Sequence, residues 1–224
     1  MDDSLKIYVN KVSQPSCAVL AFCDLNGIKY ERIEVDIYSG GLMTEEFRKV
    51  NPLMQIPVII DNEYNLTECH AILRYLHATR KCDDHWYPSD PVERSKVDQL
   101  LDWHHTNLRQ GCYGQLKRKI IMPLFGIEPR EEEIKDLQKL LHLSLKFMNK
   151  ILGINKFLTG ENITIADLSL GFEVQSTPLV DVDLASKYPN VAKWMNRLKE
   201  TPEINTIMKD MGVEKNTERM KAKI

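Results

Sequence analysis

The stretch that decides the fold is residues 51–76, NPLMQIPVIIDNEYNLTECHAILRYL. Its two short apolar runs, separated by a turn, predict two strands, and a pattern typical of a helix begins at Thr67 and Glu68. We expect Thr67 to precede the first helical turn and Glu68 to lie within it. The unpaired N–H groups of that turn would then face the loop that ends at Pro57. This arrangement predicts a site for an anionic, peptide-like ligand.

Both features of this site also have a purely structural interpretation. Most X-Pro bonds occur in turns for structural reasons. A glutamate in the first turn of a helix interacts favourably with the helix dipole whether or not a ligand binds. The pattern alone therefore leaves the ligand site and the structural interpretation open.

Toward the N-terminus, the pattern adds two strands and two helices. Residues 5–9 and 30–35 are rich in β-forming residues and predict strands. Pro15 suits the start of a helix that stops at Gly27, and residues 45–50 predict a short helix. The order strand, helix, strand, helix, strand, strand, helix implies a small sheet covered by helices.

Toward the C-terminus, the apolar periodicity lapses over residues 81–91, which mark the best candidate for a domain boundary. Beyond it we expect one long helix lined by apolar residues over 97–108, a second over 134–152 and another over 191–198. Residues 164–167 form a capping box, which predicts a further helix start. We therefore expect an α/β domain in residues 1–82, a linker in 83–90, an all-helical domain in 91–211 and a frayed tail in 212–224.

The overall composition excludes several classes of protein. With a formal net charge of -2 and a pI near 6.3, the chain has no excess of Lys and Arg for general nucleic-acid binding. No segment approaches the roughly 20 apolar residues that span a bilayer, and no early apolar run resembles a signal peptide. We expect a soluble, cytoplasmic protein.

The cysteines and histidines form no recognised metal-binding motif. The five cysteines are scattered without a CxxC spacing, so neither a disulfide framework nor a zinc site is expected. The six histidines include no HExxH motif. His104 and His105 are adjacent in a predicted helix, where neighbouring side chains point apart. We therefore expect no metal.

Several motifs in both halves of the chain together resemble one known family. The motifs are Ser13-Gln14-Pro15-Ser16, Asn51-Pro52-Leu53 with Ile56-Pro57, Leu66-Thr67-Glu68, and Phe157-Leu158-Thr159-Gly160 with Ile165-Ala166-Asp167. On these motifs the chain is similar to the cytosolic glutathione transferases, most of all to the theta class, from about residue 5 to about residue 202. This resemblance implies a thioredoxin-like N-terminal domain and an all-helical C-terminal domain, paired as a homodimer with the active site between the domains.

The resemblance also implies which residues bind glutathione, the expected co-substrate. Ile56, before a Pro57 that is expected to be cis, would pair through its backbone with the cysteinyl unit as an added strand. Glu68 and Cys69 would hold the γ-glutamyl end at the helix N-terminus. Gln55 falls where the family places a donor to the glycyl carboxylate.

Ser13 is the catalytic residue that the resemblance implies. The thiolate is the nucleophile, and a hydrogen bond from the Ser13 hydroxyl would lower the pKa of the glutathione thiol. From the residues alone, a turn serine that bonds the backbone is the other interpretation, and both stay open. Arg109 matches an arginine near the electrophile in the theta class, and Asp102 would reach the γ-glutamyl amine across the dimer interface.

The chain departs from the theta pattern at several positions. Leu42 replaces a histidine, Gln55 a lysine and Cys69 a serine that theta relatives commonly use on glutathione, which predicts weak glutathione affinity. Cys17 stands where relatives usually carry an arginine. A thiol in the first turn of a helix can have a depressed pKa, which permits a thiol oxidoreductase that uses Cys17. A small buried residue is the alternative interpretation.

We therefore expect an enzyme, a glutathione S-transferase that conjugates the glutathione thiolate to small hydrophobic electrophiles in detoxification, with hydroperoxide reduction as a further activity. The alternatives are a non-catalytic transferase-like module for protein interaction and the Cys17 oxidoreductase. The electrophile pocket is expected in the helical domain, and it should be more open than in vertebrate theta enzymes because no long C-terminal extension follows. The sequence does not identify the electrophile.

Overall fold

The computed structural model describes residues 5–213 of the 224-residue chain. These residues form four strands, β1 (Leu5–Val9), β2 (Glu31–Glu34), β3 (Val58–Asp61) and β4 (Tyr64–Thr67), in the sheet order β2-β1-β3-β4. Alternate residues of the inner strand β1 are buried, as the alternating sequence predicted. β2 pairs parallel with β1, whereas β3 pairs antiparallel with both β1 and β4.

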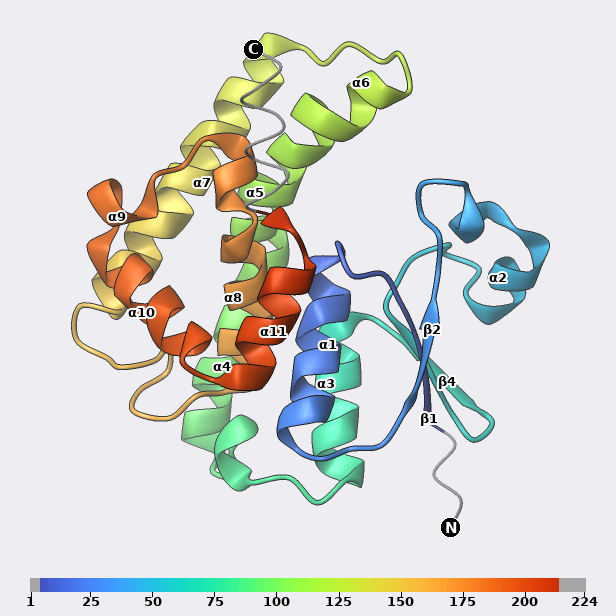
Figure 1. Ribbon diagram of the computed structural model, residues 1–224. Coiled ribbons are helices and arrows are strands. Elements are labelled where there is room, and N and C mark those ends of the chain that lie inside the picture. Colours follow the sequence, from blue (N-terminus) through green and yellow to red (C-terminus); the bar gives the residue numbers. More distant parts are fainter. Residues whose placement is uncertain (1–4, 214–224) are drawn as a thin grey trace.

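Helices lie on both faces of this sheet (Figure 1). α1 (Gln14–Leu25) and α3 (Cys69–Thr79) lie between the sheet and the helical half of the molecule, and α2 (Glu45–Val50) lies on the other side. Phe47 anchors α2, because it packs in a small apolar cluster with Val35 and Val58. The predicted order of strands and helices is therefore confirmed.

The second half of the chain is helical, as predicted. Its central helix is α8 (Ile165–Gln175), all of whose residues are buried. α1 packs against α8 and α11 (Pro202–Asp210), and this contact joins the two halves. The other helices are α4 (Pro91–Thr106), α5 (Leu108–Leu116), α6 (Met122–Leu124), α7 (Glu131–Ile151), α9 (Leu184–Lys187), α10 (Pro189–Lys199) and α11 (Pro202–Asp210), with short turns of 3₁₀ or π helix at Gly41–Met43, Asp84–Trp86, Lys117–Ile121 and Thr177–Val180.

One predicted helix is wrong in its extent. The apolar pattern over residues 97–108 predicted one long helix, whereas α4 ends at Thr106 and α5 begins at Leu108. The break lies at Asn107, whose backbone has φ -119° and ψ -83°. The Asn107 side-chain amide donates to the carbonyl of Trp103 at 3.0 Å, a local bond that competes with continuation of the helix.

The predicted capping box is present at the start of α8. One carboxylate oxygen of the buried Asp167 accepts a hydrogen bond from the Thr164 N–H at 2.9 Å. The other oxygen accepts from the Leu158 N–H and from the Trp194 indole N–H, both at 2.9 Å. This one side chain therefore ties α8 to the preceding loop and to α10.

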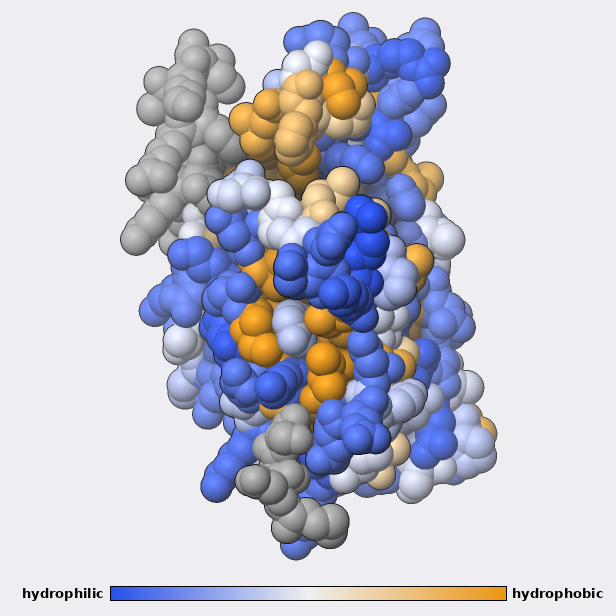
Figure 2. Space-filling model, turned by 90° about the vertical axis from the view of Figure 1, so that its right-hand side faces the viewer, coloured by the Kyte–Doolittle hydropathy of each residue, from blue (hydrophilic) through white to orange (hydrophobic). Residues whose placement is uncertain are grey.

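The surface on the sheet side of the molecule is mostly polar, with apolar areas over its middle and at the end where α6 lies (Figure 2). Leu124 and Phe125 at the end of α6 are 71% and 73% exposed. Within residues 5–213, no helix is both long and apolar enough to cross a membrane.

The C-terminal end of the described chain is packed rather than frayed. Val213 is 3% exposed and belongs to the hydrophobic core. The frayed tail was expected from residue 212, so this part of the expectation is wrong. The rest of that tail, residues 214–224, lies outside the described residues.

Candidate active site

Three of the predicted site segments meet at one edge of the sheet. In the register of the sheet, the ends of β1 and β4 lie beside Val58, the first residue of β3. Ser13 follows β1, Pro57 directly precedes β3, and Glu68 directly follows β4. The antiparallel pairing therefore brings together segments that lie far apart in the sequence.

The loop before β3 has the predicted cis peptide bond between Ile56 and Pro57. Within residues 5–213, the backbone N–H and C=O of Ile56 have no hydrogen-bond partner. The buried Asn51 fixes this loop: its side-chain amide donates to the carbonyl of Gln55 at 2.8 Å, and its oxygen accepts from the Leu53 N–H at 3.0 Å. The loop therefore presents an unpaired backbone amide at the sheet edge.

Asn51→Ala should destabilise the fold and loosen this loop. The substitution removes two side-chain hydrogen bonds of a residue that is 1% exposed, so the free energy of unfolding should fall by about 1–3 kcal/mol in urea titrations. Gln138→Ala, at an exposed position of α7, is the control and should change it by less than about 0.5 kcal/mol. Equal stability of the two variants would show that Asn51 does not hold the loop.

The start of α3 differs from the prediction. Thr67 does not cap the helix, because Glu68 is the N-cap, and no acid lies in the first turn. Glu68 is exposed, its side chain makes no capping bond, and its backbone has φ 70° and ψ 113°, a rare conformation for a residue other than glycine. The first N–H groups of the helix have no acceptors within it, so they remain available to a ligand.

Cys69, the first residue of α3, is buried. Burial raises the pKa of its thiol to about 12, although the charge of Arg109 and a hydrogen bond with Ser169 act in the opposite direction. The thiol is therefore neutral at physiological pH, and Cys69 offers a ligand its backbone N–H and no charge.

Ser13 is the N-cap of α1. Its oxygen accepts from the Ser16 N–H at 3.4 Å and from the Ser16 hydroxyl at 3.0 Å. A hydroxyl accepts and donates at the same time, so Ser13 can cap the helix and still give its own proton to an acceptor at the sheet edge. The two interpretations of this serine are therefore compatible.

Cys17 lies one turn further along α1 and is 1% exposed. Its thiol donates to the carbonyl of Lys11 at 3.2 Å. Burial raises the pKa of this thiol to about 12, with a smaller opposing effect of Arg32. The depressed pKa that a first-turn position permits is not found, because burial raises the thiol pKa more than the charge of Arg32 lowers it. The alternative interpretation, a small buried residue, is confirmed.

Cys17 should therefore resist glutathionylation. After incubation of the native protein with oxidised glutathione, mass spectrometry should find no adduct at Cys17, because a buried, protonated thiol does not attack a disulfide. Cys82 is the internal control, since it is partly exposed while the other four cysteines are buried. An adduct at Cys17 in the folded protein would restore the oxidoreductase interpretation.

Arg109 lies near the start of α5 and makes an ion pair that the sequence did not reveal. Its Nη1 donates to Oε2 of Glu173 at 2.8 Å, and its guanidinium lies 4.7 Å from the centre of the Tyr113 ring. The Arg109 side chain is 26% exposed, whereas that of Glu173 is fully buried. Burial alone would raise the pKa of Glu173, but the charge of Arg109, with help from His104, holds it below its usual value.

Leu42 and Gln55 differ in their surroundings. Leu42 is partly buried and packs against the apolar cluster around Phe47. Gln55 is exposed. Leu42 therefore has a packing role, whereas the side-chain amide of Gln55 is exposed to solvent on the loop.

Two cavities lie away from this edge. One, of about 330 Å³, is lined by residues of α4 and α7 with Leu158 and Thr159, and another, of about 300 Å³, lies beside the linker. Neither is lined by Ser13, Ile56 or Arg109. Neither of these two cavities therefore identifies the expected electrophile pocket.

Family models for the glutathione S-transferase N-terminal and C-terminal domains match residues 4–78 and 112–202. The chain belongs to the glutathione S-transferase family. Glutathione S-transferase T1 of Arabidopsis thaliana is 37% identical over 204 residues, which cover 88% of this chain and 83% of that protein. Glutathione S-transferase theta-2 of Mus musculus is 35% identical over 196 residues, which cover 87% of this chain and 80% of that protein. Glutathione S-transferases T3 and T2 of Arabidopsis are longer, and the match covers only 35% and 34% of them.

Solved structures agree with this assignment. Human glutathione transferase theta-2, in complex with glutathione and an unknown ligand, matches this transferase with a TM-score of 0.89 and 30% identity, over 98% of this chain and 91% of that chain. Apo human glutathione S-transferase T1-1 matches with a TM-score of 0.83 and 32% identity, over 93% and 91%. The predicted glutathione transferase fold and the resemblance to the theta class are thus confirmed.

Sequence reasoning missed two residues that shape the site of this transferase. Asn51 fixes the loop before Pro57 through its side chain, whereas the sequence showed it only as part of the Asn51-Pro52-Leu53 motif and gave that side chain no role. Glu173 lies within α8, where no local pattern distinguishes a buried acid from an exposed one.

Proposed function

We propose that this glutathione S-transferase binds glutathione at the edge formed by Ser13, Ile56 and Glu68, and transfers its thiolate to small hydrophobic electrophiles. The observation that carries the proposal is the sheet register, which brings a capping serine, an unpaired backbone amide and a helix N-terminus together. These groups match the thiol and the peptide backbone of the cysteinyl unit and the carboxylate of the γ-glutamyl unit of glutathione.

Each part of glutathione would have its own partner. The N–H and C=O of Ile56 would extend the sheet by pairing with the cysteinyl unit. Glu68 would hold the γ-glutamyl amine, and the N–H groups that start at Cys69 would bind its carboxylate. Gln55, exposed at the loop, would donate to the glycyl carboxylate.

Ser13 would activate the thiol without acting as a base. A hydrogen bond to a charged group contributes roughly 1.5–3 kcal/mol. At about 1.36 kcal/mol per pKa unit, such a bond to the thiolate lowers a thiol pKa of about 8.5 by about one to two units. Positioning of the thiolate and stabilisation of its charge would then account for the catalysis.

Glutathione binding is expected to be weak. Leu42 is engaged in apolar packing, Gln55 is neutral, and the Cys69 thiol is neutral and buried. The loss of one charged contact at roughly 1.5–3 kcal/mol weakens binding by about tenfold to a hundredfold.

Arg109 is the residue that we propose to contact the electrophile. One N–H group of its guanidinium donates to Glu173, and the part that stays exposed would assist a leaving group or an oxygen that gains negative charge. Halides, epoxides and organic hydroperoxides have this property, and we propose them as the substrate class. We propose that the pocket that holds them lies in the helical half.

Homodimer formation, a cytoplasmic location and the domain division are part of the same proposal. Met43, Leu53 and Tyr64 are 64%, 61% and 51% exposed, which favours a second copy on the sheet side. Asp102, on the exposed side of α4, is available for the proposed contact across the interface.

The five unpaired cysteines suit a reducing compartment. We retain residues 1–82 and 91–211 as the two domains, with a linker between them.

Calorimetric titration of glutathione into the protein, followed by a conjugation assay with a chlorinated aromatic electrophile, tests this function. We expect binding and a conjugation rate above the rate without enzyme. The absence of binding at millimolar glutathione would favour the alternative, a transferase-like module for protein interaction, over the enzyme.

A further inference from the structure

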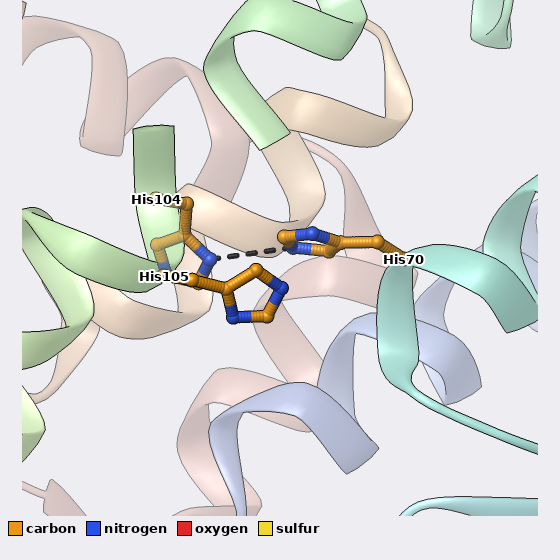
Figure 3. A group of neighbouring side chains, drawn as sticks. All are labelled: His70, His104 and His105. Atoms are coloured by element: carbon orange, nitrogen blue, oxygen red, sulfur yellow. Dashed lines mark hydrogen bonds between the residues drawn. The ribbon is translucent and has the colours of Figure 1, made fainter. Parts of the chain in front are cut away.

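Three histidines that the transferase mechanism does not use converge where α3 meets α4 (Figure 3). His70 comes from α3, and His104 and His105 come from the end of α4. One nitrogen of each ring lies within 4.8 Å of the other two. Adjacent histidines on a helix diverge, but the ring of His70 reaches both of them, which the sequence pattern did not reveal.

The two buried rings already have the spacing of metal ligands. Nδ1 of His104 lies 3.3 Å from Nε2 of His70. Two nitrogens bound to one tetrahedral Zn²⁺ at about 2.0–2.1 Å lie about 3.3–3.4 Å apart. His70 and His104 are 5% and 4% exposed, so their rings are held in place by packing.

The third ring, that of His105, can move, which a metal site without a bound ion requires. His105 is exposed, so its side chain can change rotamer and close to ligand distance while leaving a path for the ion. Nε2 of His70 also lies 2.7 Å from the Ser169 hydroxyl, which would have to release that nitrogen when a metal binds.

The carboxylate of Glu173 lies near the other nitrogen of the His104 ring. Nε2 of His104 lies 3.6 Å from Oε2 of the buried Glu173. Neither this nitrogen nor Oε1 of Glu173 has a hydrogen-bond partner within residues 5–213. A histidine that binds a metal usually directs its other nitrogen to a carboxylate, which fixes the ring and increases its basicity.

We propose that His70, His104 and His105 form a binding site for a divalent transition metal, of which Zn²⁺ fits best, with water in the fourth position. Three imidazoles favour zinc, copper and nickel over magnesium or calcium, which prefer oxygen ligands. The proposal replaces the expectation of no metal, which rested on the absence of CxxC and HExxH motifs and on the divergence of adjacent histidines in a helix. It does not depend on the proposed glutathione chemistry.

Titration of the glutathione-free protein with Co²⁺ and Zn²⁺ tests the site, with a phosphine in place of a thiol reductant. Wild type should bind one Co²⁺ with the visible absorption of a tetrahedral ion, and Zn²⁺ should displace it. His105→Ala, at an exposed position, should weaken binding at least tenfold, since even the loss of an outer partner of a ligand costs about 10–100-fold.

The control is His142→Ala, which removes another exposed helical histidine, one bonded to the Tyr188 hydroxyl at 2.6 Å. It should bind the metal as wild type does. Three results would overturn the site. They are an intense near-ultraviolet band from sulfur ligation, equal metal affinity in wild type and His105→Ala, and an equal loss of metal affinity in His105→Ala and His142→Ala.

Discussion

Ser13→Ala should reduce kcat/KM for conjugation about tenfold to a hundredfold at neutral pH. The substitution removes a hydrogen bond to the glutathione thiolate worth roughly 1.5–3 kcal/mol, and about 1.4 kcal/mol corresponds to a factor of ten in rate. The loss should shrink as the pH rises, because the variant then regains thiolate by simple ionisation. Initial rates measured from neutral pH upward test both parts of this expectation.

The structure adds a stability effect that must be separated from this loss. Because Ser13 is the N-cap of α1, its replacement by alanine should also lower the free energy of unfolding by about 1 kcal/mol. Ser16→Ala is the matched control, since it removes the hydroxyl that donates to Ser13 but leaves the proposed donor itself. Folded Ser13→Ala with the wild-type rate would remove Ser13 from the mechanism.

Glu173→Gln should lower the free energy of unfolding by about 3 kcal/mol. Removing one partner of a buried ion pair costs about 3–5 kcal/mol, and the lower value applies because Arg109 keeps 26% of its side chain exposed. The variant leaves Arg109 without its counter-charge in a site that is largely closed to solvent. Urea unfolding measures the effect.

The pH dependence gives this prediction a second test. A carboxyl whose pKa is lowered in the folded state contributes stability that is fully present above its unfolded value of 4.5 and is lost as the pH falls through the folded pKa. The difference in the free energy of unfolding between wild type and Glu173→Gln should therefore become smaller below pH 4.5. Glu93→Gln, which breaks an exposed pair with Lys96, should cost less than about 1 kcal/mol at any pH. A similarly small cost for Glu173→Gln would contradict the account.

Features that depend on neighbouring residues were predictable from the sequence. The short helix over residues 45–50 and the capping box at Asp167 are examples, because turn chemistry, caps and apolar periodicity act within a few residues. The cis bond before Pro57 and the overall fold followed from resemblance to the family rather than from the pattern.

Features that depend on packing between distant segments were not predictable. The break at Asn107 was missed for another reason, because the local bond that causes it leaves the apolar pattern unchanged. The burial of Cys17 raises its thiol pKa and decides between two interpretations that the sequence left open. Glu173 and the meeting of His70 with the end of α4 arise only when α3, α4 and α8 pack together.

The most direct test of the central claim is the pKa of the bound glutathione thiol, measured from thiolate absorbance against pH at saturating glutathione in wild type and Ser13→Ala. The account predicts a pKa about one to two units below the value of about 8.5 for a free thiol in wild type, and a value close to that of the free thiol in Ser13→Ala. Bound glutathione with an unshifted thiol pKa in wild type, or with the same lowered pKa in both proteins, would contradict it.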